Sequence, residues 1–81
     1  MKIRMYAYRD AKNEGQFSMP MTDFSDDLAK RHFAMVCSNS GSEMGFAPQD
    51  FDLYYLGEYD FTTGQVDSVT PEFVCNGVNV V

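Results

Sequence analysis

Two segments of this chain alternate between apolar and polar residues with the two-residue period of a β-strand. In residues 2–8, Ile3, Met5 and Ala7 fall on one face, and Lys2, Arg4, Tyr6 and Tyr8 fall on the other. In residues 52–61, Leu53, Tyr55, Tyr59 and Phe61 fall on one face, and Asp52, Tyr54, Leu56, Glu58 and Asp60 fall on the other. Both segments therefore predict strands, one of them with a basic and aromatic side.

Glycine and proline mark the limits of the strands that follow. Gly57 interrupts the second alternating segment and predicts a bulge. Thr62-Thr63-Gly64 predicts a hairpin loop into a further strand over residues 65–69, which Pro71 is expected to end. Near the C-terminus, Asn76-Gly77 stands between β-branched residues and fits either a hairpin or a single strand that pairs with a second subunit.

A helix is predicted between the two alternating segments. Thr22 and Ser25 are both suitable N-caps, acidic residues follow where the helix dipole favours them, and Gly41 supplies a stop signal. At about 100° per residue the apolar face is broad, and the charged residues lie opposite it. The apolar face contains Phe24, Leu28, Ala29, Phe33, Met35 and Val36, and the opposite face contains Asp27, Lys30 and Arg31.

These elements predict an α+β fold, with a small antiparallel sheet of three to five strands and one helix packed on one face. The 81 residues are enough for a single domain, residues 1–81, and too few for two. A domain of this size has a small core, so we expect stabilisation by self-association, most simply as a homodimer.

Charge is distributed unevenly along the chain, whose net charge is −6. Residues 1–31 hold all six basic and five acidic residues, for a sum of +1, whereas residues 32–81 hold seven acidic residues, for −7. This asymmetry predicts one basic and one acidic face, although uneven scatter in a small protein would give the same counts.

The basic and aromatic strand face predicts a site for single-stranded nucleic acid, which proteins hold with cations along the backbone and with rings that stack on bases. The predicted binding residues are Lys2, Arg4, Tyr6, Tyr8, Arg9 and Lys12, with Lys30 and Arg31 of the helix as secondary candidates. Two alternatives stay open. The face is an ordinary exposed strand surface, or its cations pair with the acidic strand and are neutralised there.

No arrangement of residues predicts catalysis, a metal or another cofactor. Asp52, Glu58 and Asp60 lack the spacing of a cation site, and a solvated strand face explains them. His32, Cys37 and Cys75 do not match a zinc pattern and are expected to be a core histidine and two buried thiols. We therefore expect that the protein is not an enzyme.

Two further features bear on partners and location. The six methionines, Met19 among them, either fill gaps in the core or form a surface for protein partners. No apolar run reaches the length of a membrane span and the N-terminus lacks the apolar core of a signal peptide, so we expect no membrane contact and a cytoplasmic protein.

The run from Pro48 to Asp60, followed by Thr63-Gly64, resembles the most recognisable stretch of a phage protein family. That family is the small nonstructural protein of gokushovirus-type microviruses (Gokushovirinae, Microviridae), which are bacteriophages with circular single-stranded DNA. Weaker matches are the run from Tyr8 to Lys12, Phe17 with Pro20, and Arg31 with Phe33. The resemblance does not include residues 72–81.

The resemblance implies a nonstructural protein of the host cytoplasm that binds DNA during genome replication or packaging. Together with the basic strand, it leads us to expect a non-catalytic protein that binds single-stranded DNA. The alternative is an assembly or regulatory adaptor that binds a viral or host protein through its acidic face and its methionines.

Overall fold

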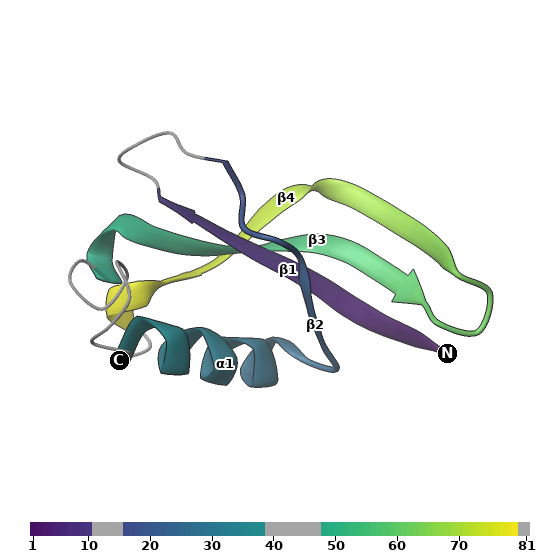
Figure 1. Ribbon diagram of the computed structural model, residues 1–81, viewed down its shortest axis with the longest axis horizontal. Helices are drawn as coiled ribbons and strands as arrows, with labels where there is room; N and C mark the ends of the chain where they lie inside the picture. Colours follow the sequence, from purple (N-terminus) through teal and green to yellow (C-terminus); the bar gives the residue numbers. More distant parts are fainter. Residues whose placement is uncertain (11–15, 39–47, 80–81) are drawn as a thin grey trace.

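The computed structural model describes residues 1–10, 16–38 and 48–79. Four strands, β1 (Lys2–Asp10), β2 (Met21–Asp23), β3 (Phe51–Asp60) and β4 (Gln65–Asn76), form one antiparallel sheet in the order β2-β1-β3-β4. The helix α1 (Asp26–Ser38) lies along one face of this sheet (Figure 1). Short 3-10 turns, η1 (Pro48–Asp50) and η2 (Gly77–Asn79), flank the last two strands. The predicted α+β class is confirmed.

The helix begins where its capping residue predicts. The backbone N–H of Leu28 donates to Ser25 Oγ at 3.2 Å, so Ser25 is the N-cap. Asp26 and Asp27 occupy the first turn, where the helix dipole favours negative charge. Of the two predicted N-caps Ser25 is confirmed and Thr22 is wrong, because Thr22 pairs with Met5 inside β2.

The core lies between α1 and the sheet. Its buried residues are Tyr6, Ala29, Phe33, Cys37, Phe51, Leu53 and Cys75. The helix contributes every fourth residue from Ala29 to Cys37 to this core. The buried face is narrower than the apolar face that the sequence predicts, because Phe24 and Met35 are 63% and 70% exposed. The prediction of two buried free thiols is confirmed, and burial raises the pKa of both Cys37 and Cys75.

A bulge at Gly57 changes which side of the sheet each half of β3 faces. Met5 of β1 pairs with Gly57 while the next residue, Tyr6, pairs with Tyr55, so Leu56 is an extra residue. Gly57 has a φ of +130°, and a Cβ there would lie 2.0 Å from the carbonyl oxygen of Asp67. The predicted bulge is therefore confirmed, and it breaks the uniform alternation predicted for residues 52–61.

The C-terminal strand differs from its prediction in two ways. Pro71 does not end it, because β4 is an edge strand, where a missing N–H costs no ladder hydrogen bond on the outer side. Of the two alternatives for Asn76-Gly77 the hairpin is wrong, because residues 77–79 form η2, and pairing with a second subunit stays a prediction. The side chain of Asn76 instead donates to the carbonyl oxygen of Gln49 at 2.8 Å, which ties the end of β4 to η1.

Replacing Gly57 tests the bulge. We expect Gly57→Ala to lower the free energy of unfolding by about 3 kcal/mol or more, because the new methyl group collides with backbone in β4. Gly64→Ala is the matched control: Gly64 has a φ of +81° but open space around it, so we expect a loss of only about 1 kcal/mol. Urea unfolding followed by circular dichroism measures both, and equal losses would contradict the role of the bulge.

Candidate functional site

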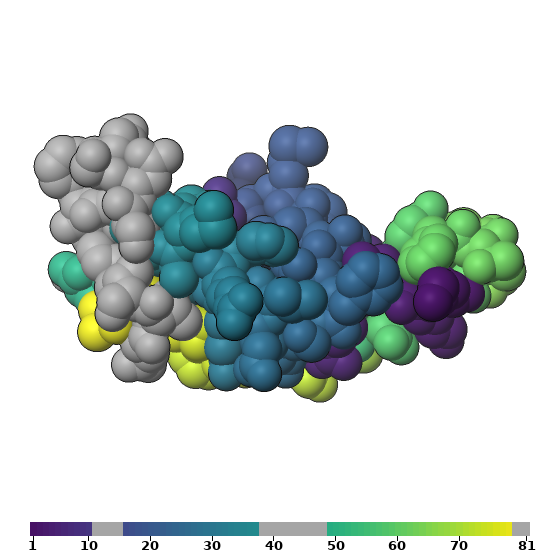
Figure 2. All heavy atoms as spheres, turned by 90° about the horizontal axis from the view of Figure 1, so that it is seen from below, coloured from purple at the N-terminus to yellow at the C-terminus, as the bar shows by residue number. Residues whose placement is uncertain are grey.

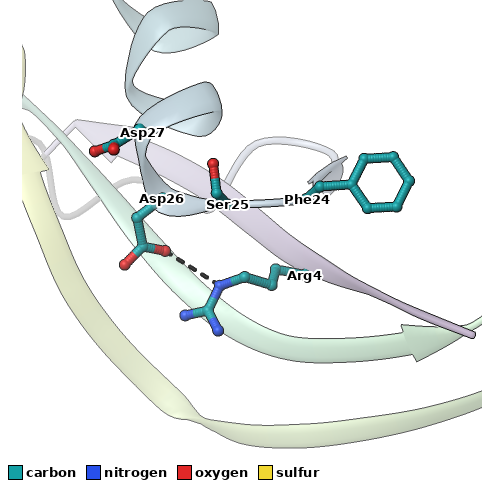
Figure 3. A pocket seen from close by; sticks show the side chains of 5 residues that line it. All are labelled: Arg4, Phe24, Ser25, Asp26 and Asp27. Carbon is teal, nitrogen blue, oxygen red and sulfur yellow. Dashed lines mark hydrogen bonds and ion pairs between the residues drawn. The ribbon is translucent and has the colours of Figure 1, made fainter.

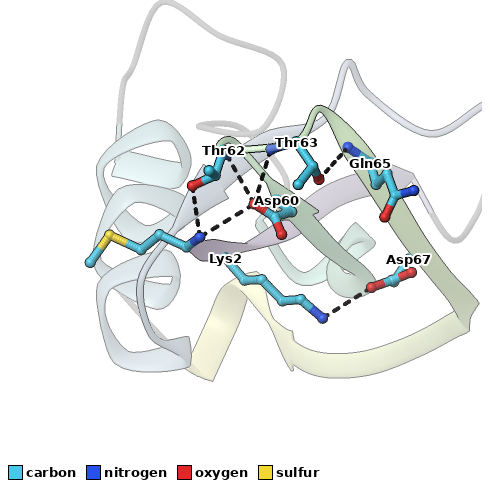
Figure 4. Close-up of polar contacts among 7 residues, drawn as sticks. Lys2, Asp60, Thr62, Thr63, Gln65 and Asp67 are labelled. Atoms are coloured by element: carbon cyan, nitrogen blue, oxygen red, sulfur yellow. Dashed lines mark hydrogen bonds and ion pairs between the residues drawn. The ribbon is translucent and has the colours of Figure 1, made fainter.

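The first two basic residues of β1 are paired with acidic residues. Lys2 Nζ lies 3.1 Å from Asp67 Oδ2, and Arg4 Nε lies 3.2 Å from Asp26 Oδ1 (Figures 3 and 4). The hydrogen bond with Asp67 raises the pKa of Lys2. Both cations are thus paired with acidic residues, although the partners lie on β4 and α1 and are not the predicted acidic residues Asp52, Glu58 and Asp60.

The N-terminus adds a further pair at the same end of the sheet. The ammonium group of Met1 lies 3.3 Å from Asp60 Oδ1 and 2.9 Å from Thr62 Oγ1 (Figure 4). The backbone N–H groups of Thr62 and Thr63 also donate to Asp60 Oδ1. The bond from Thr62 is the main reason that the pKa of Asp60 lies below its usual value. This end of the sheet therefore carries several polar contacts around Asp60.

The aromatic residues predicted to stack on bases face the helix. Tyr6 is fully buried, its hydroxyl donates to Asp26, and Arg4 Nε donates to that hydroxyl at 2.9 Å. The ring of Tyr8 packs against Phe33 of α1 with centroids 5.9 Å apart. The prediction of an exposed Tyr6 is wrong, because a tyrosine fits a core when its hydroxyl reaches partners at the core's edge.

A different set of rings lies on the face of the sheet that α1 does not cover. Phe17 and Tyr54 meet edge to face with centroids 5.3 Å apart, and Tyr54 meets Phe73 in the same way at 6.1 Å. The guanidinium carbon of Arg9 lies 4.9 Å from the centroid of Phe17 and 5.1 Å from that of Tyr54. Phe17 and Phe73 are 37% and 59% exposed. We call these four residues the aromatic row.

The sheet register brings the aromatic row together. Ala7, Tyr54 and Phe73 are paired across β1, β3 and β4, and the small, fully buried Ala7 leaves room for rings beside it. The segment that carries Phe17 is attached to β1, because Ser18 N–H donates to the carbonyl oxygen of Tyr8 at 2.7 Å and Ser18 Oγ accepts from Tyr8 N–H at 3.0 Å. The sequence gives no signal for this row, since its rings come from three separate segments.

The acidic strand face predicted from β3 is divided by the bulge. Glu58 is in register with Arg4 on the helix side, whereas Asp52 is in register with Arg9 on the open side. Asp52 accepts a hydrogen bond from Asn76 Nδ2 at 2.8 Å. The prediction of one continuous acidic face is therefore wrong, and the open side has Arg9 and Asp52 side by side.

The remaining predicted residues lie elsewhere. Lys30 and Arg31 are on α1, across the sheet from the aromatic row, and Lys12 lies outside the described residues. His32 is not a core residue: it is more than half exposed, and its Nδ1 lies 2.9 Å from Oδ2 of the buried Asp23. The eight predicted binding residues therefore do not form one surface.

Two features are absent from the part of the chain that the structure describes. No group of three or more His, Cys, Asp or Glu side chains in this part of the chain is arranged to hold a metal ion. No helix there is long and apolar enough to cross a membrane.

The methionines fall into two groups. Met19 and Met35 are 88% and 70% exposed, against the interpretation that the methionines fill gaps in the core, whereas Met21 packs on the core.

These features define a class: a small α+β domain in which the helix α1 covers one face of a four-stranded sheet and leaves an aromatic face open. A family model described as "Phage ORF5 protein" matches residues 3–80. The chain therefore belongs to the phage ORF5 protein family and is a bacteriophage protein. No curated protein and no solved structure matches it.

The buried tyrosine generates a prediction about stability. Burial and the hydrogen bond to Asp26 raise the pKa of Tyr6 to about 12, so the fold favours the neutral hydroxyl. We expect Tyr6→Phe to lower the free energy of unfolding by about 1 kcal/mol at neutral pH, through the lost hydrogen bonds. That stabilisation is complete below the unfolded-state pKa of about 10 and is lost as pH rises through about 12.

The measurement compares urea unfolding of both proteins from pH 7 to pH 12. The difference in unfolding free energy should shrink across the alkaline range, because only the wild type has this hydroxyl to ionise. A constant difference would show that the hydroxyl is not held in its neutral form by the fold.

Proposed function

We propose that this phage ORF5 protein is a non-catalytic, nonstructural protein that binds single-stranded DNA on the open face of its sheet. It acts in the host cytoplasm during genome replication or packaging of a gokushovirus-type phage. The proposed binding site is the aromatic row, which lies on the other side of the sheet from the predicted strand face, where Tyr6 is buried.

The observation that carries the proposal is the contact of Tyr54 with both Phe17 and Phe73, together with the position of Arg9 over two of these rings. Rings on an open antiparallel sheet are a common platform for unstacked bases, since every base offers a π-face whatever the sequence. Arg9 places one positive charge among the rings, where it can meet a phosphate or stack on a base.

The charge of the molecule determines what kind of binding this is. Lys2 and Arg4 are held by acidic partners on the other face, and the chain carries a net charge of −6. Long-range attraction of DNA is therefore weak, and affinity must come mainly from stacking. We therefore expect a shallow salt dependence. The logarithm of the binding constant should fall with the logarithm of the salt concentration with a slope of about −0.7, the value for a single phosphate contact at Arg9.

Fluorescence anisotropy of a labelled single-stranded oligonucleotide tests the proposal. We expect Phe17→Ala and Phe73→Ala each to weaken binding by roughly 5- to 150-fold, the loss of one stacked base. Phe61→Ala is the matched control, because Phe61 is 46% exposed but follows β3 in the hairpin loop, outside the aromatic row. Equal affinity of all variants, or no binding at low salt, would contradict the proposal.

A second candidate is an adaptor that binds a viral or host protein, and the observation that favours it is the exposure of Met19 and Met35. Flexible thioethers on a surface suit contact with protein partners. Stable co-purification with a phage capsid or replication protein, weakened by Met19→Lys and unaffected by Phe73→Ala, would favour the adaptor. The reverse pattern would favour DNA binding.

A further inference from the structure

The outward side of α1 carries an apolar stripe. Leu28, Arg31 and Met35 follow one another at spacings of three and four, which aligns them along one side of α1, and Phe24 lies just before the helix. Phe24, Leu28 and Met35 are 63%, 38% and 70% exposed, whereas Ala29 and Phe33 on the inward side are fully buried. Figure 2 looks onto this side of the molecule, where α1 forms the central part of the surface.

Charges beside this stripe are ordered along the helix. Asp27 lies in the first turn, where its neighbour Asp26 contacts Arg4 and Tyr6 of the sheet instead, and Lys30 and Arg31 follow one turn later. Asp27, Lys30, Arg31 and Ala34 line a shallow, open hollow on this side of α1. The outward side therefore changes from acidic to basic in the direction of the chain, with apolar side chains next to both halves.

Such an order is complementary to itself only when two copies run antiparallel. Residues 27 and 31 are equally distant from residue 29, so a two-fold axis crossing α1 near residue 29 places Asp27 opposite the Arg31 of a second copy. Each such contact occurs twice. The same axis places Leu28 near its own copy and Phe24 beside the last helical turns of the second copy, which include Met35. A parallel arrangement would put like charges together.

We infer that the outward side of α1, with Leu28, Arg31 and Met35 at its centre and Phe24 next to its first turn, is the surface through which two copies of this chain form an antiparallel helix-to-helix dimer. The inference is independent of DNA binding, because the aromatic row lies on the other face of the sheet. In the dimer both open faces point outward and stay accessible. The dimer also covers apolar surface that a domain with seven core residues leaves exposed.

Sedimentation equilibrium and light scattering of the full chain test the dimer. We expect a mass of twice the 9.2 kDa of one chain at micromolar concentration. Asp27→Arg and Arg31→Asp should each raise the dimer dissociation constant at least tenfold, because each homodimer then contains two like-charge contacts. Melting curves recorded by circular dichroism confirm that each variant is folded.

An equimolar mixture of the two variants provides the decisive measurement. In the mixed dimer, both contacts between positions 27 and 31 again join opposite charges, so the mixture should return to the dimer mass. The double variant Asp27→Arg/Arg31→Asp should also dimerise, for the same reason. Recovery in the mixture does not depend on what each substitution does to its own helix.

Three outcomes would overturn the inference. One is a wild-type monomer at all concentrations, and another is a dimer that neither single variant weakens, which would place the contact on another surface such as the edge of β4. The third is a mixture that remains monomeric. None of these results depends on DNA. If the dimer is not found, the proposed function is still tested separately by the anisotropy of the labelled oligonucleotide.

Discussion

The pairing of β1 with β3 at the centre of the sheet is the interaction on which the other elements depend. It runs from Lys2 with Asp60 to Asp10 with Phe51, and β2 and β4 are added to its two outer sides. The core under α1 contains side chains from both strands, among them Tyr6 and Leu53. Without this pairing the chain would have only local contacts, and isolated hairpins of this size are marginally stable in water.

Ion pairs explain why the first two cations of β1 are not available as a basic surface. Opposite charges on adjacent antiparallel strands stabilise the sheet by a few tenths of a kcal/mol to about 1 kcal/mol per pair. Lys2 pairs with Asp67 of β4 and Arg4 with Asp26 of α1, so both cations are used within the fold. Arg9 differs from Lys2 and Arg4 because its guanidinium lies against rings. The basic residues at the start of β1 thus stabilise the fold through ion pairs, and those pairs compete with the binding of any ligand.

The single-residue bulge at Gly57 separates the two halves of β3. On the hairpin side of the bulge, Tyr59 lies on the open face; on the other side, Tyr55 lies toward the helix and Tyr54 lies on the open face. One extra residue, Leu56, therefore allows the same strand to supply both a core tyrosine and a tyrosine of the aromatic row. A strand without a bulge would place Tyr55 and Tyr59 on one side, as strict alternation predicts.

Local patterns in the sequence determined the strands of residues 2–8 and 52–61, the helix capped by Ser25, the bulge and the α+β class, because periodicity, capping and glycine act over a few residues. They did not determine which side of β1 is buried. Tyr6 is in the core because its hydroxyl meets Asp26 and Arg4, a contact that forms only when α1 docks on the sheet. The aromatic row was likewise decided by tertiary structure, since Phe17, Tyr54 and Phe73 meet only through long-range strand register, which no local pattern encodes.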